Sequence, residues 1–447
     1  MSVSRHWSRR TVVAATLALT TAAALVAFGA ASSSATTKAS SARPANKIVV
    51  LAYGDAQNKA EQWAVDTYNK TPQGKKVKAV LQTIPGANYQ TKLQTIMGSS
   101  NAPDVFFNWG GGSIVQFQKA GLLLPLNGFM KADPKLKSSF LPSILSAAKI
   151  GSNYYGIPMR GTQPVMLFYN KTLLAAHHLT PPTTWAQLLS DVAALKNAGV
   201  QVPIALGGAD QWPTLMWFEY AYDRVAGPSL VTDALNGKSS VWKTPDSTKA
   251  LGYLKQLIDA GAFGPSKSWD SVYFTKNQTA QMLIGGQAAF ELMGSWYYST
   301  VQSQSASFAA KELGYSAFPS IPGGKGNLND LAGNTENYYS VLKNTRYPQA
   351  VAAFLKVMYS PAFVKQELAL GNLTTTTNTP KLISGPTAPY LRYQFNLIKK
   401  AQAFQLSWDQ AWPQTNSNAI HTAVADYFDN PDSNAFASAM AALKPAG

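Results

Sequence analysis

The sequence predicts an α/β fold built from two similar lobes. From residue 47 onward, three strand and helix patterns alternate, which is typical of a parallel sheet covered by helices. After residues 154–158 the alternation begins again. In each half an apolar strand leads to a tryptophan just past its end, Trp109 in the first half and Trp296 in the second. This repetition indicates two lobes that face each other.

The elements of the first half follow in order. A strand at 47–53 is followed by Gly54, Asp55 and an amphipathic helix; a second strand at 77–83 precedes another helix. The third strand, 105–107, ends in Asn108, Trp109 and three glycines, before a helix that Ser113 can cap. Ligands of parallel sheets lie at the carboxyl ends of the strands, so Asp55 and Trp109 are expected at one rim.

A glycine turn before a helix could also hold a phosphate. The three glycines at 110–112, however, lack both the dinucleotide-binding spacing and the Walker lysine. A flat apolar ring beside polar amides is chemistry suited to a sugar, and this is the interpretation that we adopt for the loop.

The second half contains a strand at 165–170, a capped helix at 184–195 and a strand at 202–206. An aromatic-rich helical region with Trp212 and Trp217 follows, and a strand at 288–293 leads to Trp296. Trp63 and Trp185 fall on the apolar faces of amphipathic helices, so we assign both to the core.

The N-terminus predicts export. Arg5, Arg9 and Arg10 precede an uncharged stretch rich in Ala, Val and Leu, with small residues where a peptidase could cut. We expect residues 1–35 to be a signal peptide and 36–46 a disordered linker. The twin-arginine and general secretory routes both remain open, and an uncleaved anchor is disfavoured because the stretch is a poor membrane span.

Composition limits the chemistry. The chain has no cysteine, which excludes a disulfide framework, a thiolate metal site and a cysteine lipid anchor. Its four histidines do not show metal-site spacing, and we expect them at the surface. We therefore predict no metal and no cofactor, and an extracellular, cell-surface-associated or periplasmic protein.

The net charge is +16, which invites a nucleic-acid interpretation. The basic residues are dispersed, however, and the largest cluster is only 75–78, so we expect a solvated basic surface and no nucleic-acid partner. The excess also reflects the small number of acids, 22 in 447 residues, from which we hypothesise adaptation to acidic surroundings or to an anionic cell wall.

Several blocks together resemble a known family. They are Ala-Pro-Asp-Val at 102–105, Gly-Leu-Leu-Leu-Pro-Leu at 121–126, Tyr-Gly-Ile-Pro at 155–158, Leu-Phe-Tyr-Asn-Lys at 167–171, Pro-Pro-Thr-Thr-Trp at 181–185, Met-Gly-Ser-Trp at 293–296, and Phe-Pro with Ile-Pro-Gly-Gly at 318–324. In this order they are similar to the extracellular solute-binding proteins of carbohydrate ABC transporters, the maltose-binding-protein-like group. The loop at 108–113 most resembles members that bind xylo-oligosaccharides, whereas the lipobox cysteine of many members is missing.

The resemblance implies a two-lobed periplasmic-binding-protein fold, with hinge crossovers and a ligand cleft between the lobes. It also implies a monomer that delivers a sugar to ABC permease subunits and has no enzymatic activity. The expected boundaries are 47–159 and 319–371 for lobe 1, 163–315 and 378–447 for lobe 2, and 160–162, 316–318 and 372–377 for the hinges.

Sugar recognition needs aromatic faces for apolar ring patches and planar polar side chains for hydroxyl pairs. Our stacking candidates, of which we expect two or three to contact a ligand, are Trp109, Trp212, Trp296 and Trp408. Our hydrogen-bonding candidates are Asp55, Asn108, Arg160, Asn334, Glu336 and Asp409. This mixture of acids with one arginine predicts a cleft close to neutral.

Two alternatives stay open. An exported carbohydrate protein could be a glycosidase, which requires two carboxylates beside the scissile bond. Glu219 and Asp223 lie one helical turn apart, but such pairs are more often solvated surface acids. The second alternative is a binding protein for an anionic solute.

Overall fold

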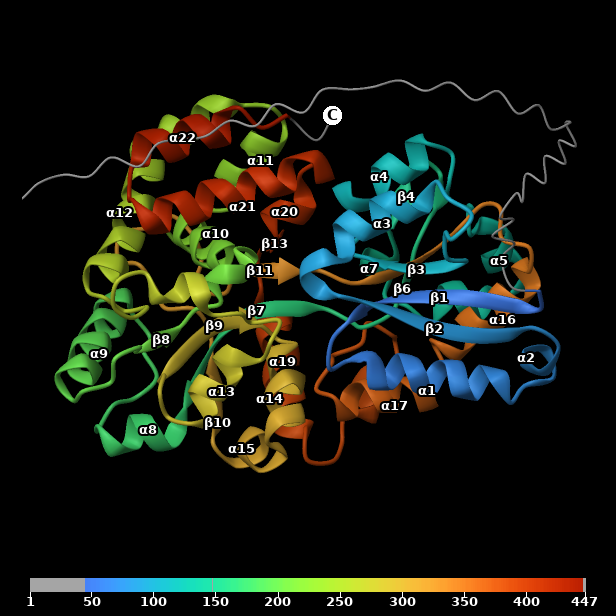
Figure 1. Cartoon of the computed structure of the whole chain (residues 1–447), viewed down its shortest axis with the longest axis horizontal. Helices are drawn as coiled ribbons and strands as arrows, with labels where there is room; N and C mark the ends of the chain where they lie inside the picture. The colour runs from blue at the N-terminus through green and yellow to red at the C-terminus, as the bar shows by residue number, and fades with distance from the viewer. Residues whose placement is uncertain (1–44, 147, 445–447) are drawn as a thin grey trace, which may run out of the picture. The chain divides into compact units, whose positions relative to one another are not determined.

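The computed structural model describes residues 45–146 and 148–444 (Figure 1). The predicted signal peptide and all but the last two residues of the predicted linker lie outside this part of the chain. Asn46, the last linker residue, is not free: its backbone N–H donates to the Tyr347 hydroxyl at 2.9 Å, and β1 begins immediately after it. No helix among the described residues is both long enough and apolar enough to cross a membrane.

The first sheet has the strand order β2-β1-β3-β12-β6. Strands β1, β2 and β3 are parallel, as the sequence predicts, whereas β12 is antiparallel to both β3 and β6. The strands are β1 (Lys47–Gly54), β2 (Lys78–Pro85), β3 (Val105–Asn108), β6 (Ile157–Pro158) and β12 (Tyr338–Val341). We call this sheet, with the helices and core packed on it, the first lobe.

The core of the first lobe follows the predicted periodicities. In helix α1 (Asn58–Asn69), Ala60, Ala64 and Tyr68 are buried on one face. Trp63 is partly buried and its ring lies 6.4 Å from that of Phe363, which confirms its assignment to the core. The other regular elements here are α2 (Pro72–Lys76), α3 (Tyr89–Met97), α4 (Gly112–Lys119), α5 (Asn127–Ala132), α6 (Pro134–Ser138), α7 (Pro142–Ser146), β4 (Lys149–Ile150), β5 (Asn153–Tyr154), α16 (Pro348–Val357) and α17 (Pro361–Ala369).

The second sheet has the order β13-β11-β7-β9-β8, with β10 also paired to β7. It is mixed, because β7 is antiparallel to β9, β10 and β11, whereas β8 and β13 run parallel to their neighbours. The strands are β7 (Gln163–Asn170), β8 (Ile204–Ala205), β9 (Phe290–Gly294), β10 (Leu313–Ser316), β11 (Leu331–Asn334) and β13 (Phe404–Leu406). This sheet with its helices and core is the second lobe.

Helix α10 (Trp212–Ala226) is central to the second lobe and is buried along nearly its whole length. Trp185 opens α9 (Trp185–Asn197) and is 2% exposed, which confirms its core assignment. The remaining α-helices of this lobe are α8 (Lys171–Ala176), α11 (Ser229–Leu235), α12 (Pro245–Asp259), α13 (Gln278–Ile284), α14 (Tyr297–Gln304), α15 (Ala306–Lys311), α19 (Ala388–Lys400), α20 (Trp408–Ala411), α21 (Gln414–Asp429) and α22 (Ser433–Ala441), whereas α18 (Thr379–Leu382) precedes the return of the chain to it.

Two of the predicted boundaries are displaced. The sequence assigns 319–371 to the first lobe, but β11 pairs with β7 and β13, and Ile321 and Leu331 belong to the core of the second lobe. The Pro/Gly-rich stretch around 318–326 therefore does not end the lobe; its Gly324 and Gly326 lie against the backbone of α10. The chain crosses to the first lobe between β11 and β12, at 335–337 rather than 316–318.

The last crossing is also later than the sequence suggests. Thr376 bridges to Phe140 of the first lobe, and α18 packs on α17. The chain returns to the core of the second lobe only from Tyr390 of α19. A run of threonines marked this segment as irregular, but its pattern could not show which core it rests on.

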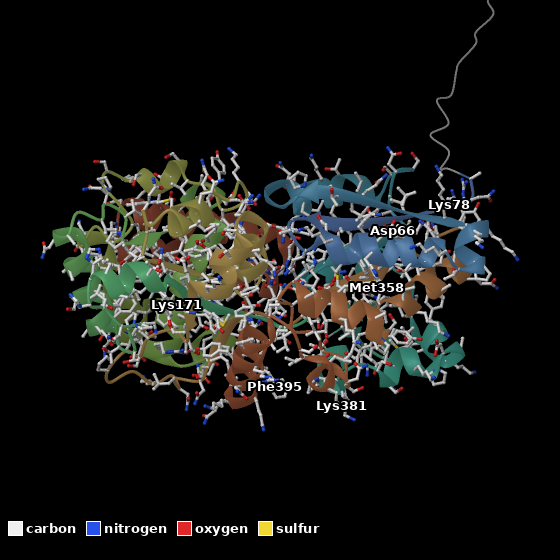
Figure 2. The ribbon with its side chains drawn as sticks, turned by 90° about the horizontal axis from the view of Figure 1, so that it is seen from below. Asp66, Lys78, Lys171, Met358, Lys381 and Phe395 are labelled. Atoms are coloured by element: carbon white, nitrogen blue, oxygen red, sulfur yellow. The ribbon has the colours of Figure 1, made fainter. Side chains whose placement is uncertain are left out.

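The basic residues are spread over the surface, as expected. Lys78, Lys171 and Lys381 are exposed and lie in separate places in Figure 2.

Candidate functional site

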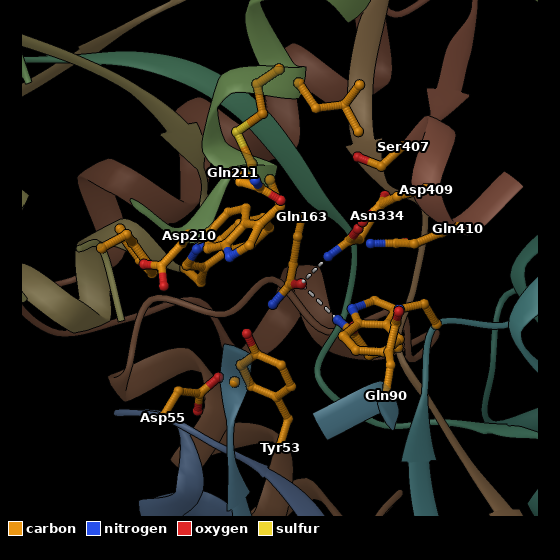
Figure 3. A pocket seen from close by; sticks show the side chains of 18 of the residues that line it. Tyr53, Asp55, Gln90, Gln163, Asp210, Gln211, Asn334, Ser407, Asp409 and Gln410 are labelled. Carbon is orange, nitrogen blue, oxygen red and sulfur yellow. Dashed lines mark hydrogen bonds between the residues drawn. The ribbon is translucent and has the colours of Figure 1, made fainter. Parts of the chain in front are cut away.

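Side chains from both lobes line one cavity of about 360 Å³ (Figure 3). This volume lies in the range of about 300 to 1,000 Å³ that is usual for small-molecule pockets. The ends of β1 and β3 deliver Asp55 and Trp109 to it, which confirms that these residues share a rim.

The aromatic wall of the first lobe is built by the Trp109 turn. Gly110 and Gly111 have φ values of 71° and 53°, which glycine adopts without strain. The turn leaves the Trp109 side chain partly buried. Its ring packs edge-on against those of Phe107 and Tyr53, with distances between ring centroids of 4.9 and 5.6 Å. The ring is thus held by aromatic neighbours while it still lines the pocket.

The second lobe supplies a facing aromatic group. Trp212 and Trp296 have ring centroids 6.0 Å apart, and Phe274 lies 5.2 Å from Trp212. All three rings line the cavity. The Trp212 Nε1 donor is buried and has no hydrogen-bond partner among the described residues.

Asp55 and Arg160 form an ion pair at the pocket wall. The Arg160 Nη1 lies 2.7 Å from Asp55 Oδ2, and the same guanidinium pairs with the buried Glu61 and donates to the Tyr53 carbonyl. Burial raises the pKa of Glu61, and the charge of Arg160 opposes that rise. Arg160 is only 2% exposed, and its charge is matched by the two carboxylates of Asp55 and Glu61.

Two further candidates also reach the pocket, Asn334 at the end of β11 and Asp409 at the start of α20. Asp409 Oδ2 lies 3.1 Å from His421 Nε2, and His421 itself lines the cavity. His421 is only 16% exposed, so the prediction of a surface position is wrong for this histidine.

Three candidates do not line the pocket. Trp408 is 0% exposed and packs against Tyr222 and Trp242 at 5.4 and 5.3 Å between ring centroids, so it belongs to the core. The turn that follows β13 points Asp409 toward the cavity and Trp408 away from it, and adjacency in sequence cannot reveal this.

The other two are buried structural side chains. Asn108 donates to the Ser340 hydroxyl and accepts from the backbone N–H of Gly110, so it shapes the Trp109 turn. Glu336 accepts from the backbone N–H groups of Gly161 and Asn337. Asn108 ends β3, as predicted, and Glu336 lies between β11 and β12, but neither lines the cavity.

Sequence reasoning missed several polar residues that line the pocket. They are Gln57, Gln90, Gln163, Asp210, Gln211, Asn337, Ser407, Gln410, Ser417 and Asn418. Some of them lie within two residues of a candidate that does line the pocket. Including the sequence neighbours of Asp55 and Asp409 would therefore have found Gln57 and Gln410. Nothing in the local pattern distinguishes Gln163, which opens β7.

The pocket is more acidic than predicted. Three lining carboxylates, Asp55, Asp210 and Asp409, face only one guanidinium, that of Arg160. Asp210 accepts from the backbone and hydroxyl of Thr275, and burial raises its pKa. The excess positive charge of the chain is therefore absent from the cavity lining.

Glu219 and Asp223 are not surface acids, and that interpretation is wrong. They are 0% and 2% exposed, and burial raises their pKa values to about 8 and about 7. Glu219 accepts from the backbone N–H of Trp408, and Asp223 pairs with Arg224. Neither lines the cavity, so this pair cannot flank a bound glycosidic bond. The described residues contain no cluster of His, Asp and Glu suited to a metal ion.

Comparison with known proteins agrees with this geometry. The family model described as bacterial extracellular solute-binding protein matches residues 53–365. An uncharacterized ABC transporter extracellular-binding protein of Pyrococcus horikoshii is 26% identical over 214 residues, 47% of this chain and 46% of that protein. The glucose-binding protein of Saccharolobus solfataricus is 21% identical over 224 residues, 48% of this chain and 39% of its own length. The chain thus spans half or less of the length of these curated relatives.

Solved structures match over more of the chain. A structure from work on xylan utilization by Caldanaerobius polysaccharolyticus superposes with a TM-score of 0.78 at 24% identity, covering 88% of this chain and 98% of that one. A chitin oligosaccharide binding protein superposes with a TM-score of 0.76 at 24% identity, covering 89% and 98%. These likenesses confirm the two-lobed solute-binding fold. Because the family model matches most of this chain, the chain belongs to the bacterial extracellular solute-binding protein family.

Proposed function

We propose that this protein binds a neutral oligosaccharide or sugar outside the cell and delivers it to the permease of an ABC importer. The observation that carries the proposal is the cavity itself, in which tryptophans from both lobes flank planar amides and carboxylates. Aromatic faces suit the apolar patches of pyranose rings, and amides or carboxylates suit their hydroxyl pairs.

The relatives support this choice of solute. Two of the matching structures are titled for xylan utilization and for chitin oligosaccharide binding, and one curated relative is named for glucose. The pattern of the Trp109 loop favours xylo-oligosaccharides among these. Trp109, Trp212 and Trp296 are the proposed stacking residues, with Asp55, Asn334 and Asp409 as hydrogen-bonding residues.

The charge of the lining argues against an anionic solute. An acidic sugar would meet Asp55, Asp210 and Asp409, whereas the one lining arginine is already paired with Asp55 and Glu61. A lining with three carboxylates and one arginine disfavours a ligand of negative charge and favours hydroxyl donors.

We propose that closure of the two lobes completes the site. One buried carboxylate, that of Glu336, ties the first two crossing segments to the Thr375 segment of the first lobe. Glu336 Oε1 accepts from Gly161 N at 2.6 Å and from Asn337 N at 2.8 Å, and its Oε2 accepts from the Thr375 hydroxyl at 2.5 Å. Changes in the backbone dihedral angles of a few residues in such short segments can move one lobe relative to the other while both cores stay packed.

Export, a monomeric state and the absence of catalysis complete the proposal. Residues 1–35 would serve as the signal peptide, and a chain without cysteine offers no site for a thioether-linked lipid. Incubation with oligosaccharides should yield binding without products, because Glu219 and Asp223, the carboxylate pair that the sequence suggests for catalysis, do not line the cavity.

A thermal-shift screen tests the proposal. The panel contains xylobiose, xylotriose, maltose, glucose and N,N′-diacetylchitobiose, with glucuronic acid and glucose 6-phosphate as anionic controls. A sugar at a hundred times its dissociation constant should stabilise the protein by about 2.7 kcal/mol. Stabilisation by the anionic compounds alone would contradict the proposal.

A further inference from the structure

Five amide side chains connect the pocket to a buried carboxylate, and we call this set the amide relay. Asn334 and Asn337 donate through Nδ2 to Gln163 Oε1, at 3.1 and 2.7 Å (Figure 3). Gln163 Nε2 then donates to Gln57 Oε1 at 3.4 Å, and Gln57 Nε2 to Asn372 Oδ1 at 2.5 Å. Asn372 Nδ2 donates to Glu367 Oε2 at 2.5 Å, which ends the relay.

The relay has a fixed direction. An amide donates from its nitrogen and accepts at its oxygen, whereas the carboxylate oxygen that meets Asn372 accepts. Turning any one amide over would set two donors or two acceptors against each other. Burial raises the pKa of Glu367; in this structure its Oε2 accepts from Asn372 Nδ2, and its Oε1 has no partner among the described residues. Glu367 therefore sets which end of every amide faces the pocket.

At the pocket end, the relay leaves acceptors without donors. Asn334 and Asn337 both line the cavity and are 4% and 1% exposed. Their Oδ1 atoms are buried and have no hydrogen-bond partner among the described residues. Buried acceptors without a donor are unfavourable, so this arrangement fits a ligand whose hydroxyl reaches these oxygens as the lobes close over it.

We propose that the Asn334 and Asn337 carbonyl oxygens form a donor-selecting subsite, and that Glu367 is a positioning residue that fixes their orientation through Asn372, Gln57 and Gln163. This inference rests on the proposed function and names the group that the site recognises: a free sugar hydroxyl. A fluorine, an ether oxygen or a carboxylate in the same position offers only an acceptor, and the subsite rejects it.

The first experiment needs no variant. The probes are xylobiose, maltose and N,N′-diacetylchitobiose, each with the series of analogues in which one hydroxyl is replaced by fluorine. Fluorine keeps the size of the group roughly but removes the donor. For a sugar that binds, replacement of at least one hydroxyl should weaken calorimetric affinity by about tenfold or more. A sugar that binds with no such penalty at any position overturns the inference and leaves the proposed function standing; if no sugar binds, both fall.

The second experiment tests the remote role of Glu367. Glu367→Met removes the acceptor that orients Asn372, so the amides can reverse and the fluorine penalty should fall to about threefold or less. Glu367→Gln keeps the size of the side chain but adds a donor, so it permits both directions of the amides and should also lower the penalty. The matched control is Glu291→Met, which removes an equally buried carboxylate of the second lobe that lies outside the relay.

A merely structural role predicts a different result. Loss of packing at Glu367 would weaken all sugars and all fluorinated analogues alike and leave the ratio between them unchanged. An unchanged ratio in folded Glu367→Met therefore contradicts the inference. Should that variant not fold, Asn372→Leu interrupts the same relay one residue closer to the pocket and should lower the ratio in the same way.

Discussion

Trp109 and Trp408 provide a matched pair for testing the site, since the sequence suggests both as stacking residues and the structure separates them. Trp109 lines the cavity and is partly buried, whereas Trp408 is fully buried among Tyr222, Trp242 and Trp412. Trp109→Ala should weaken sugar binding, and Trp408→Ala should destabilise the fold.

The magnitudes follow from these surroundings. Loss of one apolar ring from a ligand contact costs about 1.5 to 3 kcal/mol, which is roughly a 10- to 150-fold loss of affinity. Trp109→Ala also loses edge contacts with Tyr53, Tyr89 and Phe107, each worth about 0.5 to 1.5 kcal/mol, so stability should fall by about 1.5 to 4.5 kcal/mol. Trp408→Ala leaves a core cavity and should cost about 3 to 5 kcal/mol of unfolding free energy.

The assay combines urea unfolding with calorimetric titration of the sugar that binds tightest in the screen. Below the unfolding transition of each variant, we expect sugar affinity to fall in Trp109→Ala and to be retained in Trp408→Ala, although both variants lose stability. Equal affinity of wild-type protein and folded Trp109→Ala would refute the assignment of Trp109 to the ligand contact.

Four further predictions follow from the structure. Gln211 has φ 60° and ψ −47° at the pocket, so Gln211→Gly should relieve about 1 kcal/mol of backbone strain while it weakens sugar binding several-fold, measured by melting and calorimetry. Glu336→Ala removes the acceptor of the Gly161 backbone N–H and of the Thr375 hydroxyl. It should lower sugar affinity about tenfold and enlarge the radius of gyration of the protein without sugar, measured by small-angle scattering. Burial raises the pKa of Glu291 to about 8. The stability that this group contributes is therefore complete below about pH 4.5 and is lost at about 1.4 kcal/mol per pH unit as the pH rises toward 8. Glu291→Gln should reduce this fall in stability, measured as unfolding free energy against pH. Sugar affinity should change less than about twofold between 0.05 and 0.5 M salt, because a neutral ligand has no charge to screen.

Each of these predictions has a control. Lys267 also has a positive φ, 58°, but lies outside the pocket lining, so Lys267→Gly should leave affinity unchanged. Equal affinity in Gln211→Gly would remove that residue from the site, and an unchanged scattering curve for Glu336→Ala would argue against its role at the crossings. Stability that rises from pH 5 to pH 8 would contradict the effect of buried carboxyl groups, and steep salt dependence would favour a charged solute.

The pattern of the chain predicted the first lobe well, because its strands and helices carry clear periodicities. It predicted the boundaries less well: β11 is only four residues, and its membership of the second sheet depends on pairing with β7 and β13, which are distant in sequence. Short strands carry too little local signal to reveal their partners.

The site shows the same limit. Trp109, Trp212 and Trp296 could be proposed because each stands at the end of a strand or the start of a helix. Trp408 and Asp409 are neighbours that point to opposite environments, and only the packed structure distinguishes them. Gln163 and Gln57 matter through contacts across more than a hundred residues, which no local pattern can show.

The central claim is that both lobes together bind one neutral sugar, and calorimetric titration with xylobiose, maltose and N,N′-diacetylchitobiose tests it most directly. We predict saturable binding of at least one of these sugars with one site per chain, weakened at least about tenfold by Trp109→Ala in the first lobe and also by Trp296→Ala in the second. Absence of binding by every neutral sugar together with tight binding of glucuronic acid or glucose 6-phosphate would contradict it.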